Sequence, residues 1–126
     1  LGCHVLAPVW KLDPTLSWQD PGYPQGDDEP VACVSHGDAK AYVAWLSKRT
    51  GQRYRLLTDP EWHHVAASSA KDMADPARLC AIGNGADESA KQAMPSWTVA
   101  PCRDGFRTTA PVGRFAASPW GLSDLS

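Results

Sequence analysis

Apolar residues recur with helical spacing in the segment that follows Ser35. The residues at positions i, i+3, i+4 and i+7 of this stripe are Ala39, Tyr42, Val43 and Leu46. Ser35 is suited to cap the helix because its side chain can accept from the backbone N–H of Asp38, and Gly51 supplies a C′ stop. The pattern therefore predicts an amphipathic helix over residues 35–50.

A second helix start lies at Thr58, which forms an S/T-x-x-E capping box with Glu61. This signal predicts a helix over residues 59–69. We expect two short strands. One covers residues 31–34 before the first helix, and the other covers residues 53–57 between the helices, where polar and apolar residues alternate. Residues 71–78 are consistent with a loop or one helical turn.

The rest of the chain is rich in residues that break regular structure, with eleven prolines and ten glycines in 126 residues. Residues 1–29 form a loop-rich lead-in that we expect to be pinned by Trp10, Trp18 and Tyr23. Residues 79–109 are irregular, and loops of that length are usually functional or held by something extra. The expected fold class is α+β, with two helices beside a small, mostly antiparallel sheet and extensive irregular loops.

Composition limits the classes of protein to which the chain can belong. With 43% apolar residues and six tryptophans, residues 1–126 suit one domain and are too few for two of ordinary size. The net charge of −2 gives no basic stripe to neutralise phosphates, so we expect no nucleic-acid partner. The longest apolar runs are too short to cross a bilayer, so we expect no membrane partner.

Five blocks in order carry a family resemblance. They are PVACVSHGDAKAYVAW at residues 30–45, TGQRYRLLTDPEW at residues 50–62, NGAD at residues 84–87, CRDGFRTTAPVGRF at residues 102–115 and PWGLSDL at residues 119–125. The first two resemble the pattern P-V-x-x-V-S-W-x-D-A-x-A-Y-x-x-W, then T-G-x-x-Y-R-L-P-T-E-A-E-W, of the formylglycine-generating enzyme family, also called the sulfatase-modifying factor family. The resemblance covers the chain from about Trp10 to Leu125.

The resemblance implies a fold related to C-type lectins, and it implies that the chain is part of a formylglycine-generating-type oxidase. Such an enzyme uses Cu(I) bound to two thiolates and O₂ to oxidise a peptidyl cysteine of sulfatases to formylglycine. The family pattern continues with G-N-V-W-E-W and the catalytic cysteine pair, whereas this chain ends at Ser126. We therefore expect an incomplete domain that is inactive alone, assign no catalytic residue, and expect copper and a sulfatase-type peptide partner only for a complete member.

Asn84 and Asp104 are the candidate ion ligands. Both lie in glycine-flanked loops, where such residues are most often turn formers. Hard oxygen donors also suit Ca²⁺, and the resemblance implies a structural calcium in the matching blocks. Its ligands would be the side chains of Asn84 and Asp104 with the carbonyls of Gly85 and Phe106. We predict calcium binding there rather than turns alone.

Departures from the family pattern keep a second function open. They are His36 in place of Trp, Ser68 in place of Arg, Ser118 in place of Asn and Ser123 in place of Tyr. The alternative is a non-catalytic lectin-like binding module, or an accessory domain of a larger enzyme. His63 and His64 are adjacent and point about 100° apart on a helix, so they cannot bind one ion from the same face.

The four cysteines Cys3, Cys33, Cys80 and Cys102 have no C-x-x-C spacing, which argues against a zinc ribbon or a thioredoxin-type pair. Cys80 and Cys102 flank the Asn84 loop, and a disulfide and two buried thiols are equally compatible with that spacing. Secreted members of the resembled family place disulfide cysteines where this chain has Val43 and Ala66. That departure favours a bacterial cytoplasmic setting.

Overall fold

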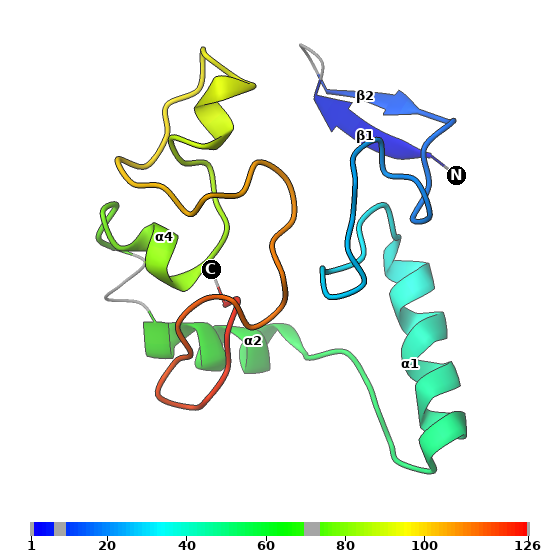
Figure 1. Ribbon diagram of the computed structural model, residues 1–126. Coiled ribbons are helices and arrows are strands. Elements are labelled where there is room, and N and C mark those ends of the chain that lie inside the picture. The colour runs from blue at the N-terminus through cyan, green and yellow to red at the C-terminus, as the bar shows by residue number, and fades with distance from the viewer. Residues whose placement is uncertain (1, 7–9, 70–73, 126) are drawn as a thin grey trace. The chain divides into compact units, whose positions relative to one another are not determined.

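The structure is a computed structural model that describes residues 2–6, 10–69 and 74–125. Its strands and helices are labelled in Figure 1. In chain order they are β1 (Cys3–Leu6), β2 (Trp10–Asp13), α1 (His36–Thr50), α2 (Asp59–Ala66) and α4 (Leu79–Ile82), with 3₁₀ turns at Ala67–Ser69 and Ala90–Gln92. The α+β class is confirmed.

The chain divides into two compact units. Unit 1 comprises Leu1–Gln25 and Val31–Thr58, and unit 2 comprises Gly26–Pro30 and Asp59–Ser126. Each unit has its own disulfide, Cys3–Cys33 in unit 1 and Cys80–Cys102 in unit 2. The expectation of one domain over residues 1–126 stays a prediction.

Unit 1 opens with an antiparallel hairpin in which β1 pairs with β2 from Cys3↔Asp13 to Leu6↔Trp10. The prediction of an irregular lead-in was therefore wrong for these residues. The predicted pinning by aromatic side chains was also wrong for Trp10 and Trp18, which are 66% and 57% exposed. A cross-strand hydrogen-bond ladder orders the hairpin from Cys3 to Asp13.

Helix α1 has the ends that its sequence predicted. The Ser35 Oγ accepts from the Asp38 backbone N at 3.1 Å, and the Asp38 Oδ2 accepts from the Ser35 backbone N at 2.8 Å, which completes a capping box. Gly51 lies in the left-handed region at φ 72° and donates its N–H to the Ser47 carbonyl at 3.0 Å. The apolar stripe is not buried, however, because no α1 residue is buried and Tyr42 is 59% exposed.

The strands predicted at residues 31–34 and 53–57 are absent. In the second of these segments the Tyr54 backbone N donates to the Ser47 Oγ at 2.9 Å. The Ser47 hydroxyl, which belongs to α1, thus accepts the hydrogen bond that a neighbouring strand would accept from this N–H in a sheet. A strand needs a partner to form its ladder, and neither segment pairs with another strand in the part of the chain that the structure describes.

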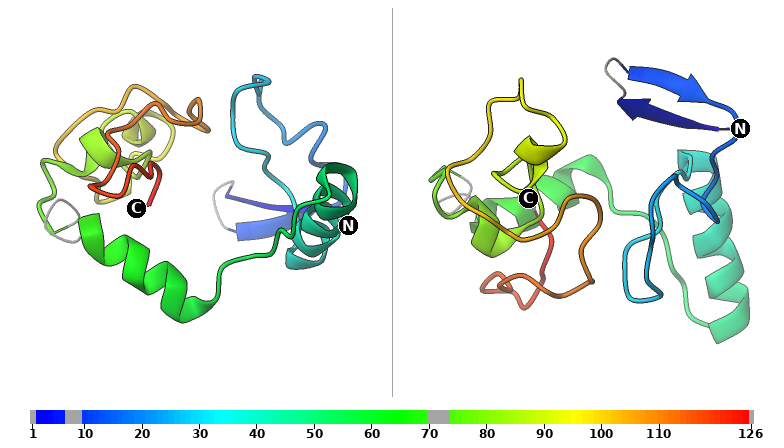
Figure 2. Two further views of the ribbon diagram at one scale, coloured as in Figure 1. Left: turned by 90° about the horizontal axis from the view of Figure 1, so that it is seen from below. Right: turned by 45° about the horizontal axis from the view of Figure 1, so that its top comes forward.

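The larger part of unit 2, Asp59–Ser126, begins with α2, and the 3₁₀ turn Ala67–Ser69 extends this helix, so the predicted range 59–69 is confirmed. The Thr58–Glu61 capping box stays a prediction. The predicted loop at residues 71–78 lies partly outside the described residues, and Asp75 and Arg78 close a turn in its remainder. Most of the chain beyond α2 is irregular, as Figures 1 and 2 show, which confirms the long loop predicted over residues 79–109 apart from α4 and Ala90–Gln92.

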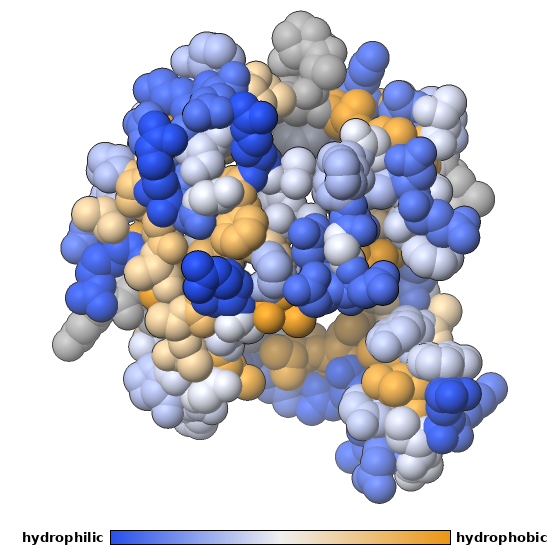
Figure 3. Space-filling view, viewed as in Figure 1, coloured by the Kyte–Doolittle hydropathy of each residue, from blue (hydrophilic) through white to orange (hydrophobic). Residues whose placement is uncertain are grey.

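Few side chains are buried among the described residues of unit 2. The apolar ones are Ala66, Ile82, Ala110 and Phe115. Many large apolar side chains reach the surface instead, and Figure 3 shows apolar residues beside hydrophilic ones on one face. No helix among the described residues has the length and apolar character needed to span a bilayer. Because so few apolar side chains of unit 2 are buried, polar contacts must supply much of its order.

Candidate metal centre

Two segments of unit 2 meet to form the site, which we call the loop cluster: residues 83–89 and residues 102–108. The disulfide Cys80–Cys102 joins α4 to the second segment, with 6.0 Å between the two Cα atoms. One backbone bond links the segments directly, from the Glu88 N to the Cys102 carbonyl at 3.1 Å, and a second, from the Ala100 N to the Ala86 carbonyl at 2.8 Å, joins the first segment to the chain just before the second. Residues between 14 and 22 positions apart are thereby held side by side.

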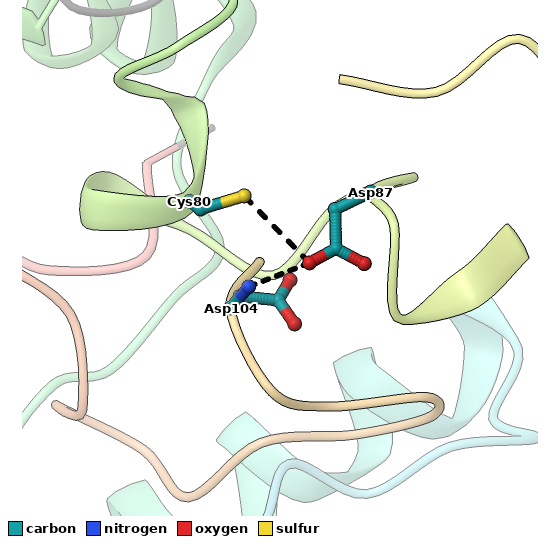
Figure 4. Close-up of side chains that lie close together, drawn as sticks. All are labelled: Cys80, Asp87 and Asp104. Carbon is teal, nitrogen blue, oxygen red and sulfur yellow. Dashed lines mark hydrogen bonds between the residues drawn. The ribbon is translucent and has the colours of Figure 1, made fainter. Parts of the chain in front are cut away.

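Asp87 organises the loop cluster from within. Its side chain is fully buried. One carboxylate oxygen, Oδ1, accepts from the backbone N of Ser89 at 2.7 Å and of Ala90 at 3.0 Å. The other, Oδ2, accepts from the Asp104 backbone N at 2.5 Å, as Figure 4 shows, and from the Ser89 Oγ at 3.2 Å. One carboxylate thus fixes the backbone of both segments.

The charge of Asp87 is stabilised by these donors. Burial raises the pKa of the carboxyl, but the N–H donors of Asp104, Ala90 and Ser89 lower it by more, so the pKa lies below its ordinary value. The Cys80 Sγ lies 3.7 Å from Oδ2. Because that sulfur is bonded to Cys102 and carries no hydrogen, the approach is a packing contact and not a donated hydrogen bond.

Asp104 joins the two segments through its own carboxylate. Its Oδ2 accepts from the Gly85 backbone N at 3.2 Å, and its Oδ1 accepts from the Phe106 backbone N at 2.7 Å. Burial raises the pKa of Asp104, and the neighbouring Asp87 raises it further, against the lowering effect of the two N–H donors. An added cation would relieve the repulsion between these carboxylates.

The four predicted calcium ligands are brought into this one cluster. Gly85 and Phe106 both contact the Asp104 carboxylate through their N–H groups. Asn84 is exposed, and its Nδ2 donates to the Thr108 carbonyl at 2.5 Å. That bond holds the side-chain amide against the second segment. A cavity of about 310 Å³ adjoins the cluster and is lined by Leu79, Cys80, Gly83, Asn84, Gly85, Ala86, Asp87 and Ala100.

The chemistry of the cluster favours a hard cation. Ligand atoms of Cys80, Asp87 and Asp104 lie within 4.8 Å of one another. The Cys80 sulfur is in a disulfide and is no thiolate, so the carboxylate, amide and carbonyl oxygens are the donors that remain. These residues fit a calcium ion.

Asp87 was missed as a site residue by sequence reasoning, although it stands in the quoted block at residues 84–87. A signal was present, because an Asp whose carboxylate can accept from the N–H groups two and three residues later is a common cap of a helical turn. The contact from Asp87 to Asp104 has no such local signal.

His63 and His64 lie outside the loop cluster, in α2. The His63 Nε2 is 3.6 Å from the Asp59 Oδ2 on the exposed face of the helix. The His64 ring packs edge-on against Trp120, with 5.1 Å between centroids. Each has an ordinary structural contact.

All four cysteines are paired. The disulfide between Cys80 and Cys102, which the spacing left open, is present. Disulfides are typical of oxidising compartments and rare in reducing ones. The structure therefore does not support the bacterial cytoplasmic setting that the missing family cysteines favoured.

Comparison with known proteins gives one consistent family. The profile described as "Sulfatase-modifying factor enzyme 1-like domain" matches residues 10–126. The chain is 30% identical over 131 residues to the formylglycine-generating enzyme of Bos taurus, covering 96% of this chain and 32% of that protein. It is 31% identical over 130 residues to the formylglycine-generating enzyme of Thermomonospora curvata, covering 95% of this chain and 39% of that protein.

A formylglycine-generating enzyme of Mus musculus is 28% identical over 131 residues, covering 96% of this chain and 32% of that protein. No solved structure gave a significant match. The chain spans about a third of the length of the curated relatives it matches. Because the profile match covers nearly all of its residues, the chain belongs to the sulfatase-modifying factor enzyme 1-like domain family.

Proposed function

We propose that this chain is part of a formylglycine-generating-type oxidase and that its loop cluster holds a structural calcium ion. The relatives named formylglycine-generating enzyme support the first part. One observation carries the second: the Asp104 carboxylate accepts from the N–H groups of Gly85 and Phe106, so three of the four residues that would supply ligands are in contact. Ca²⁺ binds six to eight oxygens. The Asn84 and Asp104 side chains and the Gly85 and Phe106 carbonyls supply a core set that water completes.

The ion's role in this proposal is to stabilise the fold. Closing a loop of about twenty residues costs conformational entropy, and an ion bound only by the folded loop offsets that cost. Asp87 does not need to touch the ion. Its bond to the Asp104 backbone N holds the ligand residue in position.

Copper does not fit the residues of this chain. Cu(I) requires soft thiolate donors, whereas the four cysteines form two disulfides and offer no thiolate. In a complete family member, bound copper would supply the activation of O₂. We assign no step of the oxidation to Cys3, Cys33, Cys80 or Cys102.

Thermal unfolding of the oxidised chain with and without Ca²⁺ tests the ion site. We expect Ca²⁺ to raise the Tm of the wild-type chain and to leave the Tm of Asp104→Ala unchanged, because that change removes the one formal negative charge among the four ligands. Asp20→Ala is a matched control, since Asp20 is an exposed Asp that accepts from the Gly22 N at 3.1 Å. A wild-type Tm that does not respond to Ca²⁺ contradicts the site.

Peptide oxidation tests the proposed reaction. The chain, incubated with a cysteine-containing sulfatase-type peptide, Cu(I) and O₂, should give no aldehyde by mass spectrometry. The full-length gene product should give it under the same conditions. Aldehyde formed by the chain alone would overturn the structural assignment of its cysteines. A copper-loaded full-length product without activity would overturn the proposed oxidase function.

One observation favours the alternative of a binding module. Unit 1 contains a cleft of about 780 Å³ whose lining includes Trp18, Tyr23 and the disulfide Cys3–Cys33. Aromatic side chains in a cleft are typical of ligand sites. Tryptophan fluorescence during titration with simple sugars tests it: saturable quenching that Trp18→Ala abolishes would favour the module.

A further inference from the structure

The disulfide Cys80–Cys102 lies between the two segments that carry the proposed calcium ligands. Cys80 is in α4, four residues before Asn84, and Cys102 is two residues before Asp104. The disulfide therefore fixes the distance between the starting points of both ligand-bearing segments. The other disulfide, Cys3–Cys33, belongs to unit 1 and joins no residue of the loop cluster.

The disulfide also touches the carboxylate that positions Asp104. The Cys80 Sγ lies 3.7 Å from the Asp87 Oδ2, the same oxygen that accepts from the Asp104 backbone N at 2.5 Å (Figure 4). Asp87 is fully buried, so the sulfur helps to exclude water from this bond. Separation of the two sulfurs would free α4 to move and expose the carboxylate that holds the ligand residue.

We propose that the disulfide Cys80–Cys102, acting with Asp87, positions the calcium ligands, so that calcium binding and this disulfide stabilise each other. The inference rests on the calcium site proposed above. Reduction by dithiothreitol transfers two electrons and two protons to the sulfur pair, giving two thiols and the cyclic disulfide of the reagent. The ion is neither oxidised nor reduced.

The physical basis is the entropy of the loop. In the oxidised chain the disulfide closes the loop, which has a sequence separation of 22 residues. In the reduced chain calcium binding must itself order that loop, so the affinity for calcium falls. The coupling is reciprocal: the factor by which the disulfide strengthens calcium binding equals the factor by which calcium favours the disulfide.

An equilibrium redox titration of the wild-type chain tests the proposal. The chain is equilibrated in buffers of varied ratio of reduced to oxidised dithiothreitol, with saturating Ca²⁺ or with Mg²⁺ at equal ionic strength. Free thiols are then alkylated, and mass spectrometry of the peptides gives the oxidised fraction of each disulfide separately. We expect Ca²⁺ to raise the midpoint ratio for Cys80–Cys102 roughly tenfold, a common size for coupling between sites. Cys3–Cys33 should not respond.

Calorimetry measures the same coupling as the change in Ca²⁺ affinity when the disulfide is removed. Ca²⁺ should bind the Cys80→Ser/Cys102→Ser variant roughly tenfold more weakly than the oxidised wild type. The matched control Cys3→Ser/Cys33→Ser should keep the wild-type affinity. If the first variant does not fold, the redox titration of the wild type decides alone.

The outcomes separate this inference from the site on which it rests. Oxidised wild type that binds no Ca²⁺ overturns the calcium site and the coupling with it. Oxidised wild type that binds Ca²⁺ while the Cys80–Cys102 midpoint stays fixed overturns the coupling alone. An equal shift of both disulfides also overturns it, because the effect would then be on general stability.

Discussion

The two units of this chain reach order by different means. Unit 1 relies on regular backbone structure: a paired hairpin and a fifteen-residue helix with a capping box at one end and a left-handed glycine at the other. Unit 2 has short helices and long loops, and its loop cluster is held by the carboxylates of Asp87 and Asp104, which accept from five backbone N–H groups. A single side chain should therefore matter far more in unit 2 than in unit 1.

The largest test of this difference is Asp87→Ala. The change leaves the backbone N–H groups of Ser89, Ala90 and Asp104, which are buried or part-buried, without their acceptor, and an unsatisfied donor shielded from water costs about 1–3 kcal/mol. We expect the free energy of unfolding of unit 2 to fall by about 3 kcal/mol or more. Urea denaturation followed by peptide-resolved hydrogen exchange measures each unit separately.

Asp20→Ala is the control for that experiment, because it removes one exposed Asp-to-backbone bond from unit 1. It should cost no more than about 0.5 kcal/mol. Equal losses in the two variants would show that carboxylate contacts carry no special weight in unit 2.

A smaller effect is expected at the end of α1. Gly51→Ala places a side chain at φ 72°, where a Cβ meets no other atom but the backbone conformation is unfavourable, so it should cost about 1 kcal/mol. Gly37→Ala lies inside the same helix and should instead stabilise it by about 0.5 kcal/mol. Far-UV circular dichroism during thermal unfolding distinguishes the two. A Gly51→Ala variant as stable as Gly37→Ala would contradict the stop assigned to Gly51.

The smallest effect concerns the start of α1 and its dependence on pH. The backbone N–H and the hydroxyl of Ser35 lower the pKa of Asp38 below its ordinary value of 3.8. A depressed carboxyl pKa contributes stability that is present above the ordinary value and lost as the pH falls through the folded value. Helicity of α1 should therefore decrease below about pH 3.8. Asp38→Asn should remove that part of the pH dependence, and an unchanged titration would contradict the capping role.

The two ends of helix α1 could be predicted because their signals are local. Ser35, Asp38 and Gly51 act within a few residues of themselves, and the structure confirms their roles. The hairpin could not be predicted in the same way, since the pairing of Cys3 with Asp13 depends on a partner ten residues away and the lead-in is rich in Pro and Gly. The predicted strands failed for the related reason that a strand requires a partner.

The candidate site shows the same limit. The resemblance to a family placed Asn84, Gly85, Asp104 and Phe106 in one site, and the structure brings them together, whereas spacing alone indicated only turns. The role of Asp87 depends on its contact with Asp104, seventeen residues later, and on burial that no periodicity announces. Sequence reasoning named the candidate ligands, which stay a prediction, and missed Asp87, which the structure places in contact with Asp104.

The disulfide Cys80–Cys102 has one more consequence, for protease digestion. It makes residues 80–102 a covalent ring, and within the ring the only tryptic site is the exposed Lys91. Cleavage after Lys91 opens the backbone without separating its halves. A molecule nicked at Lys91 alone would migrate as one band on a non-reducing gel, with the added mass of one water, and as two bands after reduction.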